Sequence, residues 1–559
     1  MRLPACLPVL LLVGVVLLPV LAGLAGTLMP AFGHFPALGA QGWSLDPWRR
    51  LLAEPGLGVS VRLTLVSGLG ATALSLLAVA LFCAAFHDHP LFRRAQLWLA
   101  PLLAAPHLAM GVGFLALAAP SGLLARLLAA PLGWVRPPDL ATVNDPWGIA
   151  LMLGLALKEA PWLLLMSLAA LNQVPAARLM TTARLLGQPT PLAWLKVVFP
   201  LVHRQIRLPL HAVLAYSLGA VDMALLLGPG SPPPLAVLPV RWFLDRDLAM
   251  NLPAAAAATL LLALTLAAIG AWHAATWLVA RAGRRWSASG TDFGASLVRL
   301  GGLLLPALLM LALASLGAML LWSVAGPWRF PDLWPRRLDL ATWSAQRAGL
   351  LGPAGATLAV ALPATALALL LAVAALEAVA RHGPAARPWL LGLTYLPLLL
   401  PQTGFLFGLQ VLLLQLGLDG GWPAVLWAHL VFVQPYVLLA LVAPWAALDP
   451  RLARSAASLG AGPLRVLCTV KLPILLRPLL AAAAIGVAVS VGQYLATLFA
   501  GAGRFATLTT EALALAAGGD RRVLGVFATL QAAIPLGCYV LALQLPRWVW
   551  RRRAGLRAA

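Results

Sequence analysis

The chain has 559 residues, of which 62% are hydrophobic and only 10% are charged. Soluble domains carry about 25% charged residues, so this composition excludes a soluble globular protein. The net charge of +22 would suit a nucleic-acid-binding protein, but the basic residues are distributed between long apolar stretches, so we expect no nucleic-acid partner.

Twelve apolar stretches follow one another along the chain, each long enough to cross a hydrocarbon core about 30 Å thick. Helices are expected, because in lipid every backbone polar group must be paired within its own segment. The first stretch is longer than the apolar core of a signal peptide, so we expect a retained helix. The predicted spans are residues 6–29, 60–86, 97–118, 148–170, 207–228, 253–280, 298–325, 350–380, 390–416, 422–447, 478–500 and 523–545. The sequence therefore predicts an all-α polytopic membrane protein.

The positions of the basic residues predict the orientation of these spans. If the amino terminus is cytoplasmic, alternate connections are rich in Arg, whereas the intervening ones mix Arg with acids, as where Arg246 lies between Asp245 and Asp247. This asymmetry follows the positive-inside rule and predicts an inner-membrane protein with both termini in the cytoplasm. The predicted cytoplasmic basic residues outside the two loops described below are Arg2, Arg93, Arg94, Arg281, Arg284, Arg285, Arg299, Arg381, Arg387, Arg547, Arg551, Arg552, Arg553 and Arg557.

A polar, basic segment with Gly and Ser separates the sixth span from the seventh. We assign residues 281–297 to a cytoplasmic linker, residues 1–280 to a first half and residues 298–559 to a second half. Each half has six spans, an even number, so both halves share one orientation. Such parallel repeats are related by an axis along the membrane normal. The arrangement suggests a central pathway between the halves.

Two predicted cytoplasmic loops, residues 171–206 and 448–477, repeat one another at a constant offset of 273 residues. Leu and Ala matches are common by chance in so apolar a chain, so the Gly, Pro and Arg matches carry the inference. The matched pairs are Arg178/Arg451, Gly187/Gly460, Val197/Val470, Pro200/Pro473, Arg204/Arg477, Ser217/Ser490, Gly219/Gly492, Gly228/Gly501 and Gly230/Gly503. The pattern indicates an internal duplication.

Each loop has the signals of a short helix, a stop and a new helix start. In the second loop Asp449 and Pro450 suit a helix start, because Asp caps free amides and Pro fits the first turn. Gly460 can take the left-handed conformation that ends a helix, and Pro473 marks entry into the next span. The first loop repeats this order with Pro175, Gly187 and Pro200. Small residues on such short helices permit close approach by a partner surface.

Together the loops resemble the EAA loop of binding-protein-dependent ABC importer permeases, whose motif is roughly E-A-A, three residues, G and later L-P. Thr181 or Thr182 and Ser455 replace the motif's glutamate. The matching positions are Ala183, Gly187, Phe199 and Pro200 in the first loop and Ala456, Ala457, Gly460, Leu472 and Pro473 in the second. The twelve-span layout is similar to the fused permeases of ferric-iron and thiamine uptake. Residues 158–161, 493–495 and 501–505 look most like the YnjC-type of fused permease.

This resemblance implies a MetI-like fold and a permease subunit rather than an enzyme. Two copies of a separate ATPase subunit would each hold one loop helix, and an external binding protein would deliver a small solute. The chain has no G-x-x-x-x-G-K-[ST] phosphate loop, so it cannot itself be the ATPase. An ion-coupled secondary transporter with two six-helix repeats and a membrane scaffold without transport are the alternatives. The substrate stays open among iron, thiamine, polyamines and oxyanions.

Polar residues within the predicted spans are candidates for the pathway, because inserting a charged side chain costs roughly 2.5–3.5 kcal/mol. Lys158 and Glu159 lie in the fourth span and Asp222 in the fifth. Lys158 could pair with Asp222, one of them could face the pathway, or they could form a cytoplasmic gate. Gln493 and Tyr494 occupy the repeat positions next to that of Asp222, so we expect polar groups from both halves at one depth.

The other polar residues of the spans suggest structural roles. Glu377 precedes Arg381 by four residues, which predicts an ion pair at a helix end. No motif indicates a cofactor, a metal site or catalysis, because the cysteines form no C-x-x-C pair and the histidines share no ligand spacing. These residues are Cys6, Cys83, Cys468 and Cys538, and His107, His211, His273 and His429.

Overall fold

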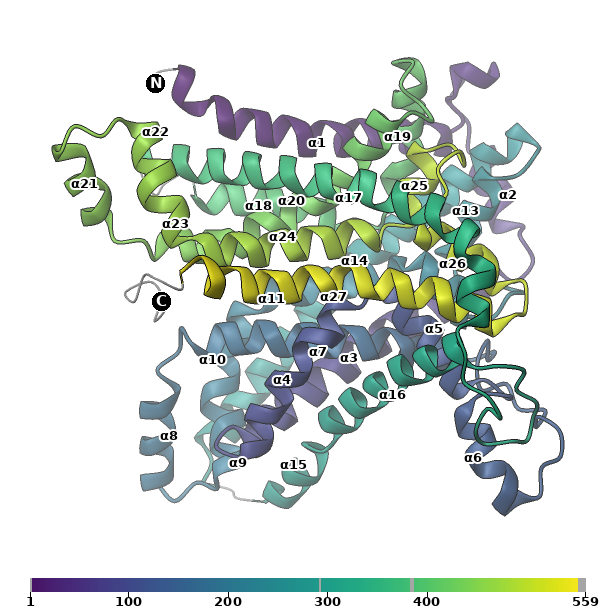
Figure 1. Ribbon diagram of the computed structural model, residues 1–559, viewed down its shortest axis with the longest axis horizontal. Helices are drawn as coiled ribbons and strands as arrows, with labels where there is room; N and C mark the ends of the chain where they lie inside the picture. Colours follow the sequence, from purple (N-terminus) through teal and green to yellow (C-terminus); the bar gives the residue numbers. More distant parts are fainter. Residues whose placement is uncertain (1–2, 291–292, 383–386, 551–559) are drawn as a thin grey trace.

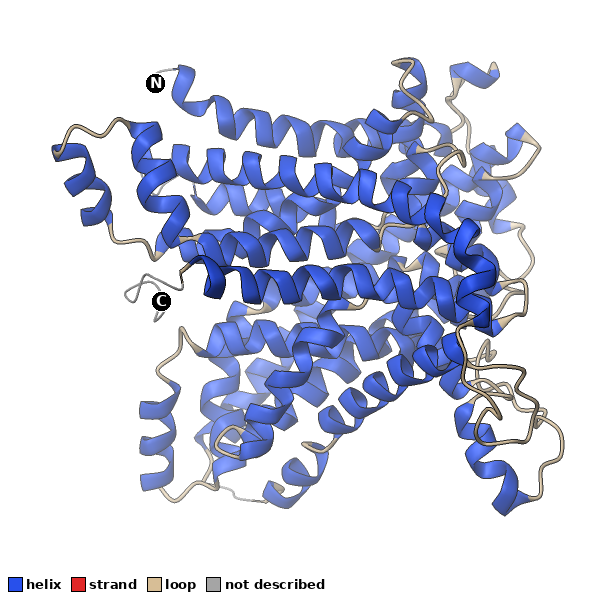
Figure 2. Cartoon of the chain, viewed as in Figure 1, coloured by secondary structure: helices blue, strands red, loops and turns tan. Residues whose placement is uncertain are grey.

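The computed structural model describes residues 3–290, 293–382 and 387–550, and within these ranges it consists of helices with two isolated β-bridges (Figure 2). By length and composition, nine helices of the described residues can cross a membrane, and the number rises to as many as twelve if each of three sharply bent helix pairs counts as one span. This confirms the predicted all-α polytopic fold. The predictions made for Arg2 and for the tail from Arg551 to Arg557 lie outside the described residues.

The two halves follow one another along the chain. The first contains α1 (Leu3–Ala31), α3 (Leu57–Phe86), α4 (Pro90–Ala104), α5 (His107–Ala118), α7 (Ile149–Leu171), α11 (Arg207–Gly219), α12 (Val221–Leu227) and α14 (Asn251–Ala288). The second contains α16 (Leu304–Val324), α17 (Ala341–His382), α18 (Arg387–Leu399), α19 (Thr403–Gln415), α20 (Trp422–Ala446), α24 (Leu476–Val491), α25 (Leu495–Ala500) and α27 (Arg521–Val549). The short helices between them include α2 (Asp46–Leu52), α6 (Leu123–Leu132), α13 (Val237–Phe243), α15 (Ala295–Gly301) and α26 (Leu508–Ala516).

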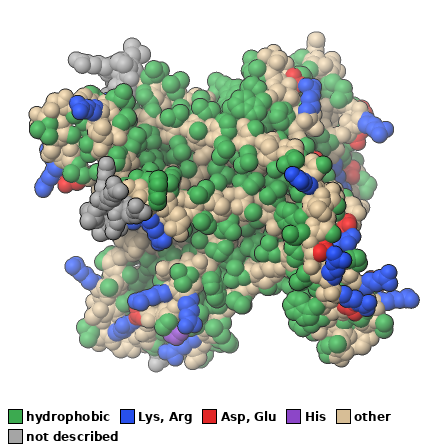
Figure 3. Space-filling model, viewed as in Figure 1, with side chains coloured by type: hydrophobic (Ala, Val, Ile, Leu, Met, Phe, Trp, Pro, Cys, Tyr) green, Lys and Arg blue, Asp and Glu red, His purple; other side chains and the backbone are tan. Residues whose placement is uncertain are grey.

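The long helices run between two ends of the bundle (Figure 1). One end, called the loop end below, carries α8 (Ala176–Leu185) and α21 (Pro450–Ser458), together with the start of α1 and the end of α27. The opposite end carries α2, α6, α13 and α26. Hydrophobic side chains cover the middle of the visible face and charged side chains gather towards the two ends (Figure 3). This distribution is expected of a protein that crosses a lipid bilayer.

The first helix of each half packs against the other half. Helix α1 lies along α19, and α16 lies along α5. Small residues allow the backbones to approach: a Cβ atom on Gly408 would lie 2.0 Å from the carbonyl oxygen of Gly23, and one on Gly113 would lie 2.4 Å from that of Ser315. Such contacts are typical of helix association within membranes. The contacts of α1 with α19 and of α16 with α5 therefore hold the two halves together.

The predicted span 298–325 has a turn at residues 302–303, and four other spans predicted as continuous helices, 97–118, 207–228, 390–416 and 478–500, are broken in the structure and were wrong in this respect. The breaks fall at residues 105–106, at residue 220, at residues 400–402 and at residues 492–494. The axis bends by 50° between α11 and α12 and by 99° between the parts of α18 and α19 on either side of the third break. Pro106 and Pro401 lack the N–H that would continue their helices, and a hydropathy profile does not register this loss.

Helices occupy most of the segment that the sequence analysis assigned to the linker. Helix α14 continues to Ala288 and α15 begins at Ala295, so the helical part of residues 281–297 belongs to these two helices. Residues 281–288 are mostly Ala and Arg, which favour helix, and a single glycine at Gly283 costs only about 1 kcal/mol. The basic segment therefore extends the sixth span beyond the apolar region.

Candidate functional site

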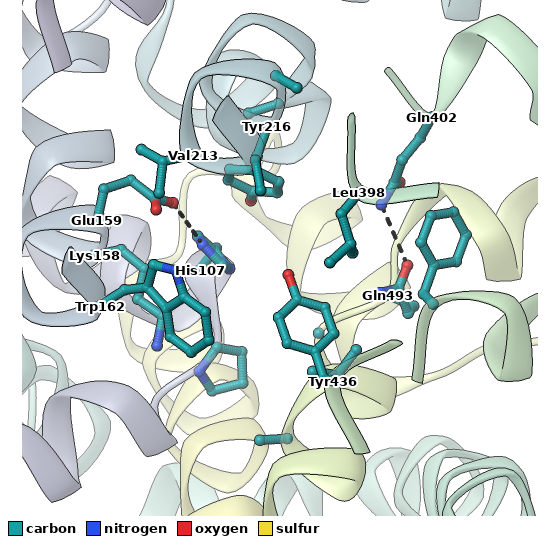
Figure 4. Close-up of a pocket in the computed structure, with 18 of the residues that line it drawn as sticks. His107, Lys158, Glu159, Trp162, Val213, Tyr216, Leu398, Gln402, Tyr436 and Gln493 are labelled. Carbon is teal, nitrogen blue, oxygen red and sulfur yellow. Dashed lines mark hydrogen bonds and ion pairs between the residues drawn. The ribbon is translucent and has the colours of Figure 1, made fainter. Parts of the chain in front are cut away.

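A cavity of about 210 Å³ lies between the two halves and is lined by residues from all four helix breaks (Figure 4). At membrane depth, irregular backbone is tolerated only where protein buries it or where it lines a cavity. Broken helices also surround the substrate sites of many transporters. The lining residues that belong to or adjoin the breaks are Ala105, Pro106, His107, Gly219, Ala220, Val221, Leu400, Pro401, Gln402, Gly492, Gln493 and Tyr494.

The structure brings all five residues predicted for the pathway to this one cavity. Lys158 and Glu159 come from α7, Asp222 comes from α12, and Gln493 and Tyr494 come from the break between α24 and α25. Both halves thus contribute polar groups at the same place. The internal duplication made this juxtaposition predictable, although the sequence did not indicate which face of each helix points inward.

Of the alternatives open for Lys158 and Asp222, an ion pair between them does not occur in the described part of the chain, and each charge interacts with a broken helix instead. The Nζ atom of Lys158 donates hydrogen bonds to the carbonyl oxygens of Leu102 at 3.0 Å, Leu103 at 2.9 Å and Ala105 at 2.7 Å. These carbonyls end α4, where the helix dipole favours a cation. Asp222 lies in the first turn of α12, where the dipole favours an anion. Both residues therefore stabilise the breaks.

Glu159 and His107 form a contact between two side chains in the first half of the cavity. The Nε2 atom of His107 lies 3.2 Å from Oε1 of Glu159, and the imidazole lies 4.3 Å from the ring of Tyr216, measured between centroids. In the second half Gln402 donates from Nε2 to Oε1 of Gln493 at 3.4 Å. The two contacts face each other across the cavity (Figure 4). Each half thus presents one polar pair.

All five tyrosines of the chain line this cavity, and sequence reasoning singled out just one of them. They are Tyr216, Tyr395, Tyr436, Tyr494 and Tyr539. Tyr436 on α20 also contacts Trp162 on α7 edge to face, with ring centroids 6.0 Å apart. The missed signal was the rarity of tyrosine in a chain of 559 residues, combined with its placement inside predicted spans.

Buried hydrogen bonds hold the break at residues 492–494. His429 on α20 contacts Oγ of Ser490 through Nδ1 at 2.8 Å and Oγ1 of Thr497 through Nε2 at 2.9 Å. Ser490 is in α24 and Thr497 is in α25, so one imidazole spans the two helices on either side of the break. The hydroxyl of Thr497 donates to the carbonyl of Gln493 at 2.9 Å. This network fixes the position of a residue that lines the cavity.

The two repeated loops have the same local structure. Helix α8 ends before Gly187, which has a φ of +78°, and α21 ends before Gly460, which has a φ of +81°. Both glycines take the left-handed conformation that the sequence predicted, which a Cβ atom disfavours. A six-residue hydrogen bond closes each helix end, from Gln188 N–H to the Ala183 carbonyl and from Ala461 N–H to the Ala456 carbonyl, both at 3.1 Å. This is the Schellman motif.

The correspondence continues beyond the glycines. A π-helical turn covers Trp194–Val198 in the first loop and Leu467–Lys471 in the second, at the same offset as in the sequence. Pro200 and Pro473 are then the second residues of the next helices. The loops are completed by α9 (Thr190–Ala193), α10 (Phe199–Gln205), α22 (Pro463–Val466) and α23 (Leu472–Ile474). The duplication is therefore visible in the backbone as well as in the sequence.

Matched leucines are exposed at the tips of both loops. Leu186 is 77% exposed and Leu459 is 88% exposed, and each immediately precedes the glycine that ends its helix. Of the small residues predicted for coupling, Ala183 is buried, Ala456 is half-buried and Ala457 is exposed. Large apolar residues this exposed, at equivalent positions, are suited to contact a second protein.

The two loops are fastened to the bundle in different ways. Lys196 donates from Nζ to Oε1 of Gln188 at 2.9 Å and to the carbonyl oxygen of Ser289 at 3.0 Å, which ties the first loop to the end of α14. In the second loop Nζ of Lys471 lies 2.6 Å from Oε2 of Glu377. The other oxygen of Glu377 pairs with Arg381 at 2.9 Å, which confirms the ion pair predicted at that helix end. Helix α8 also contains buried residues, whereas α21 contains none.

The sequence matches no known family model. It is similar to the protein described as "Inner membrane ABC transporter permease protein YnjC" of Escherichia coli (strain K12), with 35% identity over 518 residues. The alignment covers 92% of this chain and 93% of that protein, so it extends into both halves.

Proposed function

The chain belongs to the permease family of ABC transporters, and from this premise we propose that it forms the complete membrane pathway of an importer whose ATPase is a separate subunit. Both halves of the pathway are fused in this one chain. Two ATPase copies would bind the two loops, and an external binding protein would deliver a small solute to the opposite end. Family membership favours this function over the ion-coupled secondary transporter and the scaffold.

The paired loops are the observation that carries the proposal. Two short helices with the same glycine stop, the same closing hydrogen bond and an exposed leucine at the same position present two equivalent surfaces. Equivalent surfaces suit a partner that binds as two identical copies. A connector that only joined two spans would not need a repeated, exposed apolar tip.

The chain also offers a direct route from each loop to the cavity. The first loop leads through α10 into α11, which ends at the break beside Ala220. The second leads through α23, across a bend of 79°, into α24, which ends at the break beside Gln493. Movement of a loop helix would therefore displace a cavity wall. We propose that ATP-driven closure of the two ATPase copies moves both walls and opens the cavity alternately to the two sides.

The proposed orientation places the loop end in the cytoplasm of an inner membrane, with both termini on that side. The distribution of acidic residues supports this orientation. Most of them lie at the opposite end, whereas Asp88, Glu377 and Asp449 lie at the loop end. An excess of Arg over acids is expected on the cytoplasmic side. The ATPase would then find the loops on the side where ATP is available.

The test is copurification of the tagged full-length permease from its native host in several detergents. The proposal predicts that an ATPase subunit is retained at two copies per permease. It also predicts that replacing both exposed leucines, Leu186→Asp together with Leu459→Asp, releases the subunit, because charge disfavours an apolar interface. A control variant with Asp at Leu244, an exposed residue that directly follows α13 at the opposite end, should retain it. Absence of any ATPase from the wild-type complex, or its retention by the double variant, would contradict the proposal.

A further inference from the structure

The charges that line the cavity differ in sign from those of the whole chain. Lys and Arg total 39 residues against 17 acidic ones, yet the cavity is lined by two carboxylates, Glu159 and Asp222, and by one ammonium group, Lys158. The described lining residues include no Arg. Sites that recognise oxyanions rely on Arg and on free cationic donors. This lining is therefore unsuited to an anion.

The single ammonium group is already engaged. The three donors of Lys158 match the three carbonyl oxygens that it contacts, at 2.7–3.0 Å, so a solute would have to displace a helix-end interaction to reach it. Asp222 is also engaged by a helix end, because it lies in the first turn of α12, where the helix dipole favours an anion. Glu159 is different, because its contact in the described part of the chain is His107, which carries charge only when protonated. Glu159 is thus the carboxylate available to a solute.

Aromatic rings form much of the remaining wall. The five tyrosines and Trp162 surround the cavity, and the face of an aromatic ring attracts a cation, most strongly where water is excluded. A cavity of about 150 Å³ holds one benzene molecule, so 210 Å³ suits a ring with a short substituent or a compact amine of similar size. Phenol hydroxyls can also accept hydrogen bonds from an ammonium group.

We propose that the solute is a small organic cation, bound in this cavity by the carboxylate of Glu159 and by the faces of the tyrosine rings. The inference rests on the proposed function in that the bound molecule is taken to be the transported one. It assigns Glu159 as the charge-recognising residue and Tyr436, whose ring meets Trp162 across the halves, as part of the aromatic wall.

Three probes of one shape test the charge preference. Benzylammonium, benzyl alcohol and benzoate share a ring and differ in charge, and their affinities for the purified full-length permease in lipid nanodiscs are measured by equilibrium dialysis. Benzylammonium should bind about tenfold or more tightly than either of the others. Equal affinities, tighter binding of benzoate, or no binding of any probe would overturn the proposal.

Two pairs of variants locate the recognition. Glu159→Gln keeps the shape of the side chain and should lower benzylammonium affinity to that of benzyl alcohol, while an unchanged affinity for benzyl alcohol shows that the cavity is intact. Tyr436→Phe retains the ring and should bind benzylammonium within about twofold of wild type, whereas Tyr436→Leu should bind it several-fold more weakly. A Glu159→Gln variant with wild-type preference for the cation would overturn the assignment.

The two proposals fail separately. If the permease retains its ATPase but prefers benzoate or shows no preference, the solute class is wrong and the importer function stands. If it prefers benzylammonium but never retains an ATPase, the importer function is wrong and the chemistry of the cavity stands.

Discussion

Replacing Gly187 or Gly460 by valine should uncouple ATP hydrolysis from movement of the permease while leaving membrane insertion intact. A Cβ atom at either glycine would meet no heavy atom within 4 Å, so a clash does not enter the prediction. The effect comes from φ values of +78° and +81°, which cost a residue with a Cβ atom about 1–2 kcal/mol. That free energy shifts the population of the observed helix end by a factor of about 5–30.

The assay uses the permease and its ATPase reconstituted in liposomes. It compares ATP hydrolysis with the accessibility of a cysteine introduced at the cavity wall. In wild type, ATP should change the labelling rate, whereas in either valine variant hydrolysis should continue with little change in labelling. Gly187→Asn and Gly460→Asn serve as controls, because Asn tolerates the left-handed region better than other residues. Valine variants that couple normally, or asparagine variants that fail as badly as valine, would refute the reasoning.

Three further substitutions test the packing around the cavity. Lys158→Met should lower the thermal stability of the detergent-solubilised protein strongly, because it leaves carbonyls at the end of α4 unpaired at about 1–3 kcal/mol each. His429→Leu should lower the free energy of unfolding by about 1–3 kcal/mol, because two hydrogen bonds across the break at residues 492–494 are lost. Gly408→Leu should weaken contact between the halves by about 1–3 kcal/mol or more, because its Cβ would lie 2.0 Å from the oxygen of Gly23.

Gly408→Leu has a matched reference on the same chain. Gly270 lies on α14 with no atom within 4 Å of an added Cβ, so Gly270→Leu should leave the melting temperature near that of wild type. A Gly408→Leu variant as stable as Gly270→Leu would show that α1 and α19 do not depend on close approach. Wild-type stability of Lys158→Met or His429→Leu would show that the breaks are held by other contacts.

The sequence was sufficient for features that depend on local pattern. Hydropathy located the spans, and the repeated loop located Gly187 and Gly460 because a left-handed helix end needs glycine. The ion pair of Glu377 with Arg381 followed from helical spacing alone. These features need no knowledge of how one helix sits against another.

The features that the sequence did not reveal depend on helix rotation and on breaks. Lys158 looked like a partner for Asp222, but a span assumed continuous hides the free carbonyls that bind its ammonium group. His107 and Tyr216 belong to separate spans, and their contact arises from the way that α5 and α11 meet at the cavity. A single sequence contains no signal for this contact between two helices. Pro106 and Pro401 were the available hints that two of the spans are interrupted.

The most direct test of the account is the sidedness of the two loop tips. Single cysteines at Leu186 and Leu459, which are 77% and 88% exposed, are introduced into a variant without native cysteines and labelled with a membrane-impermeant maleimide. The account predicts that both react in inside-out vesicles, that neither reacts in intact spheroplasts, and that bound ATPase protects both. Labelling of the two positions from opposite sides of the membrane would contradict it.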